Sequence, residues 1–173
     1  LASVANKPAI NWQGYEPPAP TFTGTKTITG FPLKELLPFV DWTPFFIAWE
    51  LAGKYPKILE DEVVGEPARQ LFDDAQKLLD DIIENDLLQA NAIIGFWPAN
   101  SDGDDIIVFE DDTRSTIKTK LHHLRQQTNK PNNQANFCLA DYVAPKDAGL
   151  SDYIGGFVVT TGLGADELAK KYE

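Results

Sequence analysis

Three carboxylates surround a glycine at Asp102, Asp104 and Asp105, and this pattern raises the question of calcium binding. A calcium-binding loop of the EF-hand type alternates its ligands and ends on a bidentate Glu at its twelfth position. Here Ile106 takes the fifth position, which should be a ligand, and no Glu takes the twelfth. We therefore interpret Asp102-Gly103-Asp104 as a polar turn.

Two further groups have the composition of a binding site but not its spacing. Gly162-Leu163-Gly164 follows a predicted strand, as in nucleotide-binding loops, yet Glu167 stands where the third glycine should be. A turn followed by a helix start explains this segment. His122 and His123 are adjacent, so on a strand their side chains would point to opposite faces and could not chelate one ion. The sequence predicts no metal site.

Two aspartates lie beside predicted helical turns. Asp141 could orient another group, and Asp41 could bind a ligand, but a carboxylate near a helix N-terminus is also stabilised by the local dipole and by capping. No nucleophile elbow and no paired Ser and His motif is present. The residues alone therefore predict no catalytic group in this chain.

Composition excludes several classes of partner. The 173 residues include 26 Asp and Glu against 15 Lys and Arg, which gives a net charge of −11. Such a charge repels nucleic acid and anionic membrane surfaces. The apolar runs, such as Ala92 to Pro98, are far shorter than the roughly 20 residues that cross a bilayer. Cys138 is the single cysteine, which fits a reducing cytoplasm.

The first half of the chain is predicted to be mainly helical. Residues 1–30 should form an extended strap, because Pro and Gly are frequent from Tyr15 to Thr29. We expect a short helix between Pro32 and Pro38, and a second one that Thr43 caps. The clearest helix begins at Gly65 and Pro67. Its apolar face contains Ala68, Leu71, Phe72, Ala75, Leu78, Leu79, Ile82 and Ile83.

The second half is predicted to be rich in strands. Ala92 to Trp97 and Ile106 to Phe109 are short apolar runs that flank the polar turn, and the segment around Ile117 and Leu121 alternates as a hairpin partner would. Cys138 to Val143 should form a helical turn. We expect a buried strand at Asp152 to Thr161 and a capped helix from about Ala165. Because no regular βαβ alternation is present, the fold class should be α+β with an antiparallel sheet.

Several long motifs resemble one known family, the activation domain of cobalamin-dependent methionine synthase. The resemblance covers residues 31 to 164, with a helical part at 31–90 and a sheet-rich part after it. Its motifs are Asp41-Trp42-Thr43-Pro44-Phe45-Phe46, Pro98-Ala99-Asn100, Gly103-Asp104-Asp105-Ile106, Leu124-Arg125-Gln126-Gln127, Cys138-Leu139-Ala140-Asp141-Tyr142-Val143-Ala144-Pro145 and Asp152-Tyr153-Ile154-Gly155.

The resemblance implies a curved antiparallel sheet with flanking helices and a role in repair. In this family the domain brings S-adenosylmethionine (AdoMet) to a cobalamin that has been oxidised to inactive cob(II)alamin. An electron from flavodoxin or an equivalent reductase permits methyl transfer, which regenerates methylcobalamin and restores methyl transfer from methyltetrahydrofolate to homocysteine. The implied partner within the polypeptide is the cobalamin-binding domain, and cobalamin and zinc are carried by other domains.

Asp41 matches the family's AdoMet-contacting aspartate. A carboxylate there could accept a hydrogen bond from the ligand's amino group or from its ribose hydroxyls, and the bond from the amino group would be charge-assisted. The family's other AdoMet motif, an Arg with Pro and Ala followed by Gly-Tyr-Pro, is absent from these 173 residues. We therefore expect weak or undetectable AdoMet binding, and no catalysis, from this chain in isolation.

The resemblance and the lack of an initiating Met lead us to expect residues 1–173 to be a truncated, single activation domain, with a strap at 1–30 and a globular body at 31–173. A different class of function is a stand-alone acidic interaction domain that binds a partner protein and no ligand. An upstream cobalamin-binding segment or a downstream Arg and Gly-Tyr-Pro segment would favour the first hypothesis, and a stop codon at 173 would favour the second.

Overall fold

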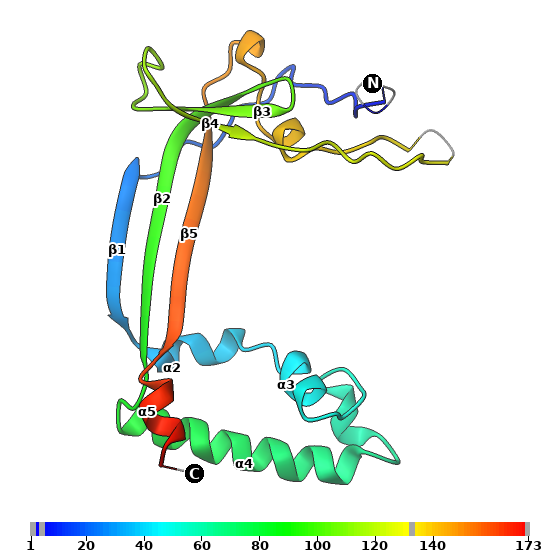
Figure 1. Ribbon diagram of the computed structural model, residues 1–173, viewed down its shortest axis with the longest axis vertical. Coiled ribbons are helices and arrows are strands. Elements are labelled where there is room, and N and C mark those ends of the chain that lie inside the picture. Colours follow the sequence, from blue (N-terminus) through cyan, green and yellow to red (C-terminus); the bar gives the residue numbers. More distant parts are fainter. Residues whose placement is uncertain (1–2, 4–5, 132–133, 172–173) are drawn as a thin grey trace. The chain divides into compact units, whose positions relative to one another are not determined.

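The computed structural model describes residue 3, residues 6–131 and residues 134–171, and it has an α+β fold (Figure 1). The helices are α2 (Leu33–Leu36), α3 (Thr43–Ala48), α4 (Gly65–Glu84) and α5 (Ala165–Ala169). The strands are β1 (Gly24–Phe31), β2 (Gln89–Asp102), β3 (Asp105–Phe109), β4 (Ile117–His122) and β5 (Asp152–Leu163). The five strands form one sheet in the order β1-β2-β3-β4, with β5 paired to β2. The predicted fold class is confirmed.

The chain divides into two compact units. The first combines residues up to 27 with residues 93–158, and the second combines residues 28–92 with residues from 159 onward. Strands β1, β2 and β5 each contribute residues to both units. In neither unit does the structure describe a helix that is long and apolar enough to cross a membrane.

The first unit contains the predicted hairpin and its core. Residues 99–102 of β2 pair antiparallel with β3, with Ser101 opposite Ile106 and Asp102 opposite Asp105, and β3 pairs antiparallel with β4. Gly103 makes the tight turn with a φ of 69°, a conformation that glycine adopts without steric cost. One cluster of buried core residues consists of Ala99, Ile106, Val108, Cys138, Ala140 and Val143.

The second unit is built on α4 and an aromatic cluster. The predicted helix begins at Gly65 and ends at Glu84, and its apolar stripe contributes Ala68, Leu71 and Phe72 to a core around Phe46 and Ile58. Aliphatic and aromatic residues spaced three and four apart share one helical face, which explains why this helix could be predicted from its sequence.

The structure corrects two predictions about strands. Residues 24–31 form a regular strand, β1, where an extended strap was expected. The prediction relied on the Pro and Gly residues and gave too little weight to Thr25, Thr27 and Ile28, whose β-branched side chains favour strands. Residues 6–23 contain no helix or strand. Strand β5 was expected to be buried, but Phe157 is 74% and Val158 is 73% exposed. A run of β-branched and aromatic residues indicates strand propensity, and burial depends on what covers the strand.

Candidate functional site

Asp41, the predicted ligand-contacting residue, lies in the second unit on the exposed segment just before α3. Its Oδ1 accepts a hydrogen bond of 3.0 Å from the backbone N–H of Thr43. No residue in the described parts of the chain donates a hydrogen bond to Oδ2. The carboxylate is therefore held at one oxygen, while the other can accept a hydrogen bond from a ligand.

Thr43 has a different role from the one predicted for it. The expected side-chain cap of α3 is absent, since Thr43 is itself the first residue of the helix and Trp42 precedes it at the N-cap position. Instead, the Thr43 Oγ1 accepts a hydrogen bond of 3.3 Å from the backbone N–H of Tyr55. Capping rules consider only residues that are close in sequence, so they cannot predict a contact between residues 12 positions apart. The prediction that Thr43 caps α3 was wrong for this reason.

Aromatic packing anchors Trp42, the residue that follows Asp41. The Trp42 ring packs edge-on against Phe72 at a centroid distance of 4.8 Å and against Phe45 at 5.5 Å. Phe46 is fully buried, and it stacks with Phe72 at 6.3 Å. Aromatic pairs at such distances stabilise a core beyond the area that they bury. Asp41 is thus an exposed carboxylate whose neighbour in sequence is anchored in a packed core.

Several large apolar side chains near Asp41 in sequence are exposed. Phe39 is 83%, Ile47 is 62% and Trp49 is 61% exposed. A carboxylate and exposed apolar side chains within one stretch of sequence are the kinds of group that bind a ligand with both a cationic and an apolar part.

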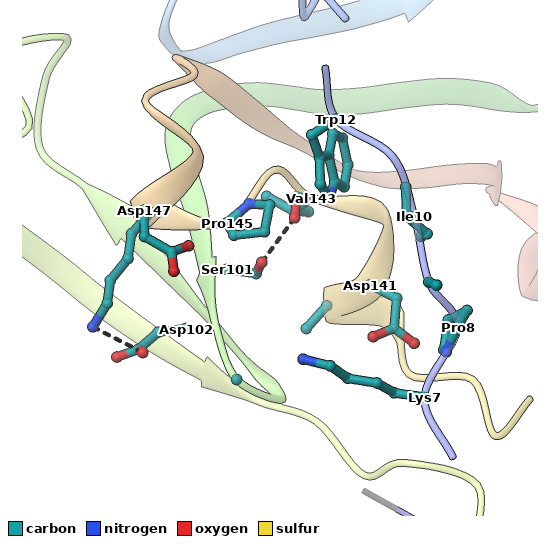
Figure 2. A pocket seen from close by; sticks show the side chains of 14 residues that line it. Lys7, Pro8, Ile10, Trp12, Ser101, Asp102, Asp141, Val143, Pro145 and Asp147 are labelled. Atoms are coloured by element: carbon teal, nitrogen blue, oxygen red, sulfur yellow. Dashed lines mark hydrogen bonds and ion pairs between the residues drawn. The ribbon is translucent and has the colours of Figure 1, made fainter. Parts of the chain in front are cut away.

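The first unit contains a separate pocket of about 370 Å³ (Figure 2). Its wall combines the N-terminal segment, which contributes Lys7 and Trp12, with the β2–β3 turn and the segment from Ala140 to Asp147. In Figure 2 the Lys7 side chain extends from the N-terminal segment into this pocket. The Lys146 ammonium lies 2.8 Å from a carboxylate oxygen of Asp102, so these two charges already neutralise each other.

Asp141 borders that pocket, but its carboxylate is engaged within the protein. It accepts two hydrogen bonds from the Arg125 guanidinium, at 2.7 and 2.6 Å, and one of 2.8 Å from the backbone N–H of Cys138. Burial by itself would raise the pKa of Asp141, but the hydrogen bonds from Arg125 and Cys138 and the charges of Arg125 and Lys7 together lower it. The interpretation of Asp141 as a capping residue is confirmed.

The carboxylates of the β2–β3 turn are also paired within the protein. Asp104 accepts hydrogen bonds from Arg125 at 2.6 and 3.1 Å, and Asp105 lies 2.9 Å from the Nδ1 of His122. Asp102 is paired with Lys146. Nowhere in the described residues do three His, Cys, Asp or Glu side chains come together in a group that could hold a metal ion. The interpretation of this segment as a polar turn agrees with these pairings.

The glycine loop near the C-terminus does not have the geometry of a nucleotide site. Strand β5 continues through Leu163, and α5 has five residues, without a side-chain cap at Gly164. Gly164 has a φ of 100°, and a Cβ there would lie 2.9 Å from the backbone oxygen of Leu87. The glycine thus permits a turn and a close backbone approach, as its interpretation as a turn requires.

Sequence reasoning missed two arginines that form internal hydrogen bonds, Arg125, which is buried, and Arg114, which is half-buried. Arg125 is 2% exposed and pairs with Asp104 and Asp141. Arg114 donates hydrogen bonds to the Asn100 side chain at 2.8 Å and to the backbone oxygen of Asp152 at 2.7 Å. The motif Leu124-Arg125-Gln126-Gln127 was a signal for the first, whereas no local pattern pointed to Arg114.

Two comparisons with known proteins give the same result. Residues 32–173 match the family model described as "Vitamin B12 dependent methionine synthase, activation domain". Among solved structures, the chain is 47% identical to one described as the crystal structure of the MetH reactivation domain bound to AdoHcy, with a TM-score of 0.91. The likeness covers 99% of this chain and 52% of that one, so this chain spans about half the length of that relative.

Proposed function

The chain belongs to the family of activation domains of vitamin B12-dependent methionine synthase, and from that premise we propose that it forms part of the module that binds AdoMet during reactivation of the enzyme. The observation that carries the proposal is the bound AdoHcy in a relative that is 47% identical over 99% of this chain. AdoHcy is what remains of AdoMet after its methyl group has been transferred. A fold that binds AdoHcy therefore presents contacts for most of the groups of AdoMet.

Asp41 is the residue through which we propose that this chain contacts the ligand. Its Oδ1 is held by the Thr43 N–H, and its Oδ2 can accept a hydrogen bond from the amino group of the AdoMet methionine part. The exposed side chains of Ile47 and Trp49 lie on α3 and directly after it, and they can contact apolar parts of the ligand. The carboxylate of Asp41 suits the amino group of AdoMet, and the apolar side chains suit its apolar parts, which supports AdoMet as the ligand.

The proposed reaction is the reductive methylation of cob(II)alamin. One electron from flavodoxin or an equivalent reductase and the methyl group of the AdoMet sulfonium yield methylcobalamin and AdoHcy. Cobalamin and zinc are contributed by other domains of the enzyme, and the cobalamin-binding domain is the proposed partner within the polypeptide. We place the activity in the cytoplasm and assign residues 1–173 to one truncated activation domain, in which the N-terminal strap ends where β1 begins at Gly24.

Replacing Asp41 tests the site directly. The Asp41→Asn variant keeps an oxygen that can accept the Thr43 N–H but loses the negative charge. In the full-length protein, we expect the dissociation constant for AdoHcy, measured by titration calorimetry, to rise about tenfold or more, since a hydrogen bond to a charged group contributes about 1.5–3 kcal/mol. An unchanged dissociation constant would remove Asp41 from the binding site.

Asp61 offers a matched control. Its Oδ1 accepts hydrogen bonds of 2.9 Å from the backbone N–H groups of Val63 and Val64, just before α4, in the same kind of local turn. The Asp61→Asn variant therefore changes the same chemical group at an exposed helix start elsewhere in the unit. We expect it to leave the dissociation constant for AdoHcy unchanged.

The isolated 173-residue chain provides a second test. We propose that ligand contacts are shared with the family's Arg and Gly-Tyr-Pro motif, which these residues lack. Without an arginine to pair with the ligand carboxylate, that charge is left uncompensated. We expect no measurable heat of AdoHcy binding at micromolar chain concentration. A micromolar dissociation constant for this chain would show instead that it contains a sufficient site.

A further inference from the structure

The Asp41 carboxylate depends on a backbone group two residues further along the chain. Its Oδ1 accepts the N–H of Thr43 at 3.0 Å, and this bond selects one orientation of an otherwise exposed and rotatable side chain. Any shift of the Thr43 backbone would therefore move or release the carboxylate. The contacts that hold Thr43 in place therefore also determine the direction of Oδ2 of Asp41.

The Thr43 side chain is tied to a second segment. Its Oγ1 accepts the backbone N–H of Tyr55 at 3.3 Å, across the loop that follows α3. The Tyr55 ring lies 5.4 Å from the Phe72 ring and stacks with Phe46 at 6.4 Å. The Tyr55 backbone is thus anchored by the same aromatic cluster that holds Trp42.

We propose that Thr43 is a positioning residue for ligand binding, which acts through Asp41 by way of its hydroxyl bond to Tyr55. This inference rests on the proposed function. The proposed function holds that the Asp41 carboxylate binds AdoMet, and the inference adds that Thr43 orients that carboxylate. The hydroxyl itself does not touch the ligand. It joins the start of α3 to the Tyr55 loop, so that Asp41 meets the ligand already oriented.

The expected size of the effect follows from the cost of ordering one side chain on binding. Immobilising a free side chain costs part of the binding free energy, so losing the pre-orientation of one carboxylate should weaken binding about threefold. The effect should be smaller than that of removing the Asp41 charge. It should also require the hydroxyl group, since valine has nearly the same shape as threonine and cannot accept the Tyr55 N–H.

The test compares Thr43→Val and Thr43→Ser in the full-length protein by titration calorimetry with AdoHcy. We expect Thr43→Val to raise the dissociation constant about threefold and Thr43→Ser, which keeps the hydroxyl, to restore the wild-type value. Equal affinity of Thr43→Val and wild type would overturn the proposal. So would equal weakening by both variants, because the hydroxyl would then be irrelevant.

A double-mutant cycle separates positioning from a general structural effect. In an Asp41→Ala background no carboxylate remains to be oriented, so adding Thr43→Val should change the dissociation constant no further. Additive effects would overturn the proposal, since Thr43 would then act independently of Asp41. Wild-type affinity in Asp41→Ala alone would reject the proposed ligand contact and this inference together, whereas weak binding in Asp41→Ala with unchanged Thr43→Val would reject this inference alone.

A stability control accompanies these measurements. Ile58 is 2% exposed in the same core, so Ile58→Val should lower the melting temperature while leaving the dissociation constant for AdoHcy unchanged. If Ile58→Val weakens binding as much as Thr43→Val at a similar melting temperature, general loosening explains the effect and the proposal fails.

Discussion

The Arg125 guanidinium binds both carboxylate oxygens of Asp141, at 2.7 and 2.6 Å, in the interior of the first unit. The Arg125 side chain is 1% and the Asp141 side chain 8% exposed. The same guanidinium also contacts Asp104, in the β2–β3 turn. One buried arginine therefore joins the segment after β4, that turn and the helical turn at Leu139–Tyr142.

Replacing Arg125 should destabilise the first unit strongly. The Arg125→Met variant leaves Asp141 buried without its main partner, and breaking a buried ion pair in this way costs about 3–5 kcal/mol. Urea denaturation of the 173-residue chain, followed by circular dichroism, measures the loss. The control is Lys118→Met, which breaks an exposed pair with Glu110 and should cost less than about 1 kcal/mol. A similar cost for both variants would contradict the prediction.

Acid should weaken the same ion pair. The pKa of Asp141 is lowered in the folded protein, because hydrogen bonds and nearby positive charges outweigh the opposing effect of burial. The stabilisation is therefore fully present above the unfolded pKa of about 3.9, and it is lost as the pH falls through the lower folded value.

The Asp141→Asn variant provides the comparison for this pH dependence. We expect it to be less stable than wild type at pH 6 and to lose less of its remaining stability than wild type between pH 5 and pH 2, because the titrating group is gone. Urea midpoints measured across this range test the difference. Parallel curves for the two proteins would show that Asp141 does not contribute to the acid dependence.

Two phenylalanines in the second unit should respond very differently to truncation. Phe46 is fully buried, so Phe46→Ala removes a ring from a packed core and should cost about 3–5 kcal/mol. Phe39 is 83% exposed, so Phe39→Ala should change the stability by less than about 0.5 kcal/mol. Denaturant unfolding of both variants gives the two values. A large loss for Phe39→Ala would mean that the residue is covered in solution.

Gly53 should be sensitive to the smallest side chain. A Cβ at this position would lie 2.8 Å from a side-chain carbon of the buried Ile58, so Gly53→Ala must displace Ile58 or the loop. Such overpacking costs about 1–3 kcal/mol. Gly162→Ala is the control, because its Cβ would meet its nearest neighbour at an ordinary 3.9 Å. Thermal melting of both variants should show a lower midpoint for Gly53→Ala alone.

Local patterns were sufficient to predict a good part of the fold. The 3.6-residue spacing around Ala68 and Phe72 predicted α4, and the polar turn at Gly103 between two apolar runs predicted the β2–β3 hairpin. Both elements depend on residues that are close in sequence, so the hydrophobic pattern of a short segment is sufficient to predict them. The helical turn after Cys138 was predicted for the same reason.

The errors arose where the deciding contacts are distant in sequence. Thr43 was expected to cap α3, but its hydroxyl meets Tyr55, 12 residues away. Arg125 meets Asp104 across 21 residues, and Arg114 meets Asp152 across 38. Phe157 has the composition of a buried strand residue, yet its exposure depends on what lies over β5. None of these contacts leaves a periodic pattern in the chain.

The sequence by itself determined the family and the α+β class, because the motifs and the local periodicities are properties of short segments, and it led us to propose Asp41 as the residue that contacts a ligand. Only the tertiary structure decided which charges pair in the interior and which oxygen of Asp41 is held. Hydrogen bonds and ion pairs act over about 3 Å in space, whatever the separation of their partners along the chain, so they are settled only when the fold brings those partners together.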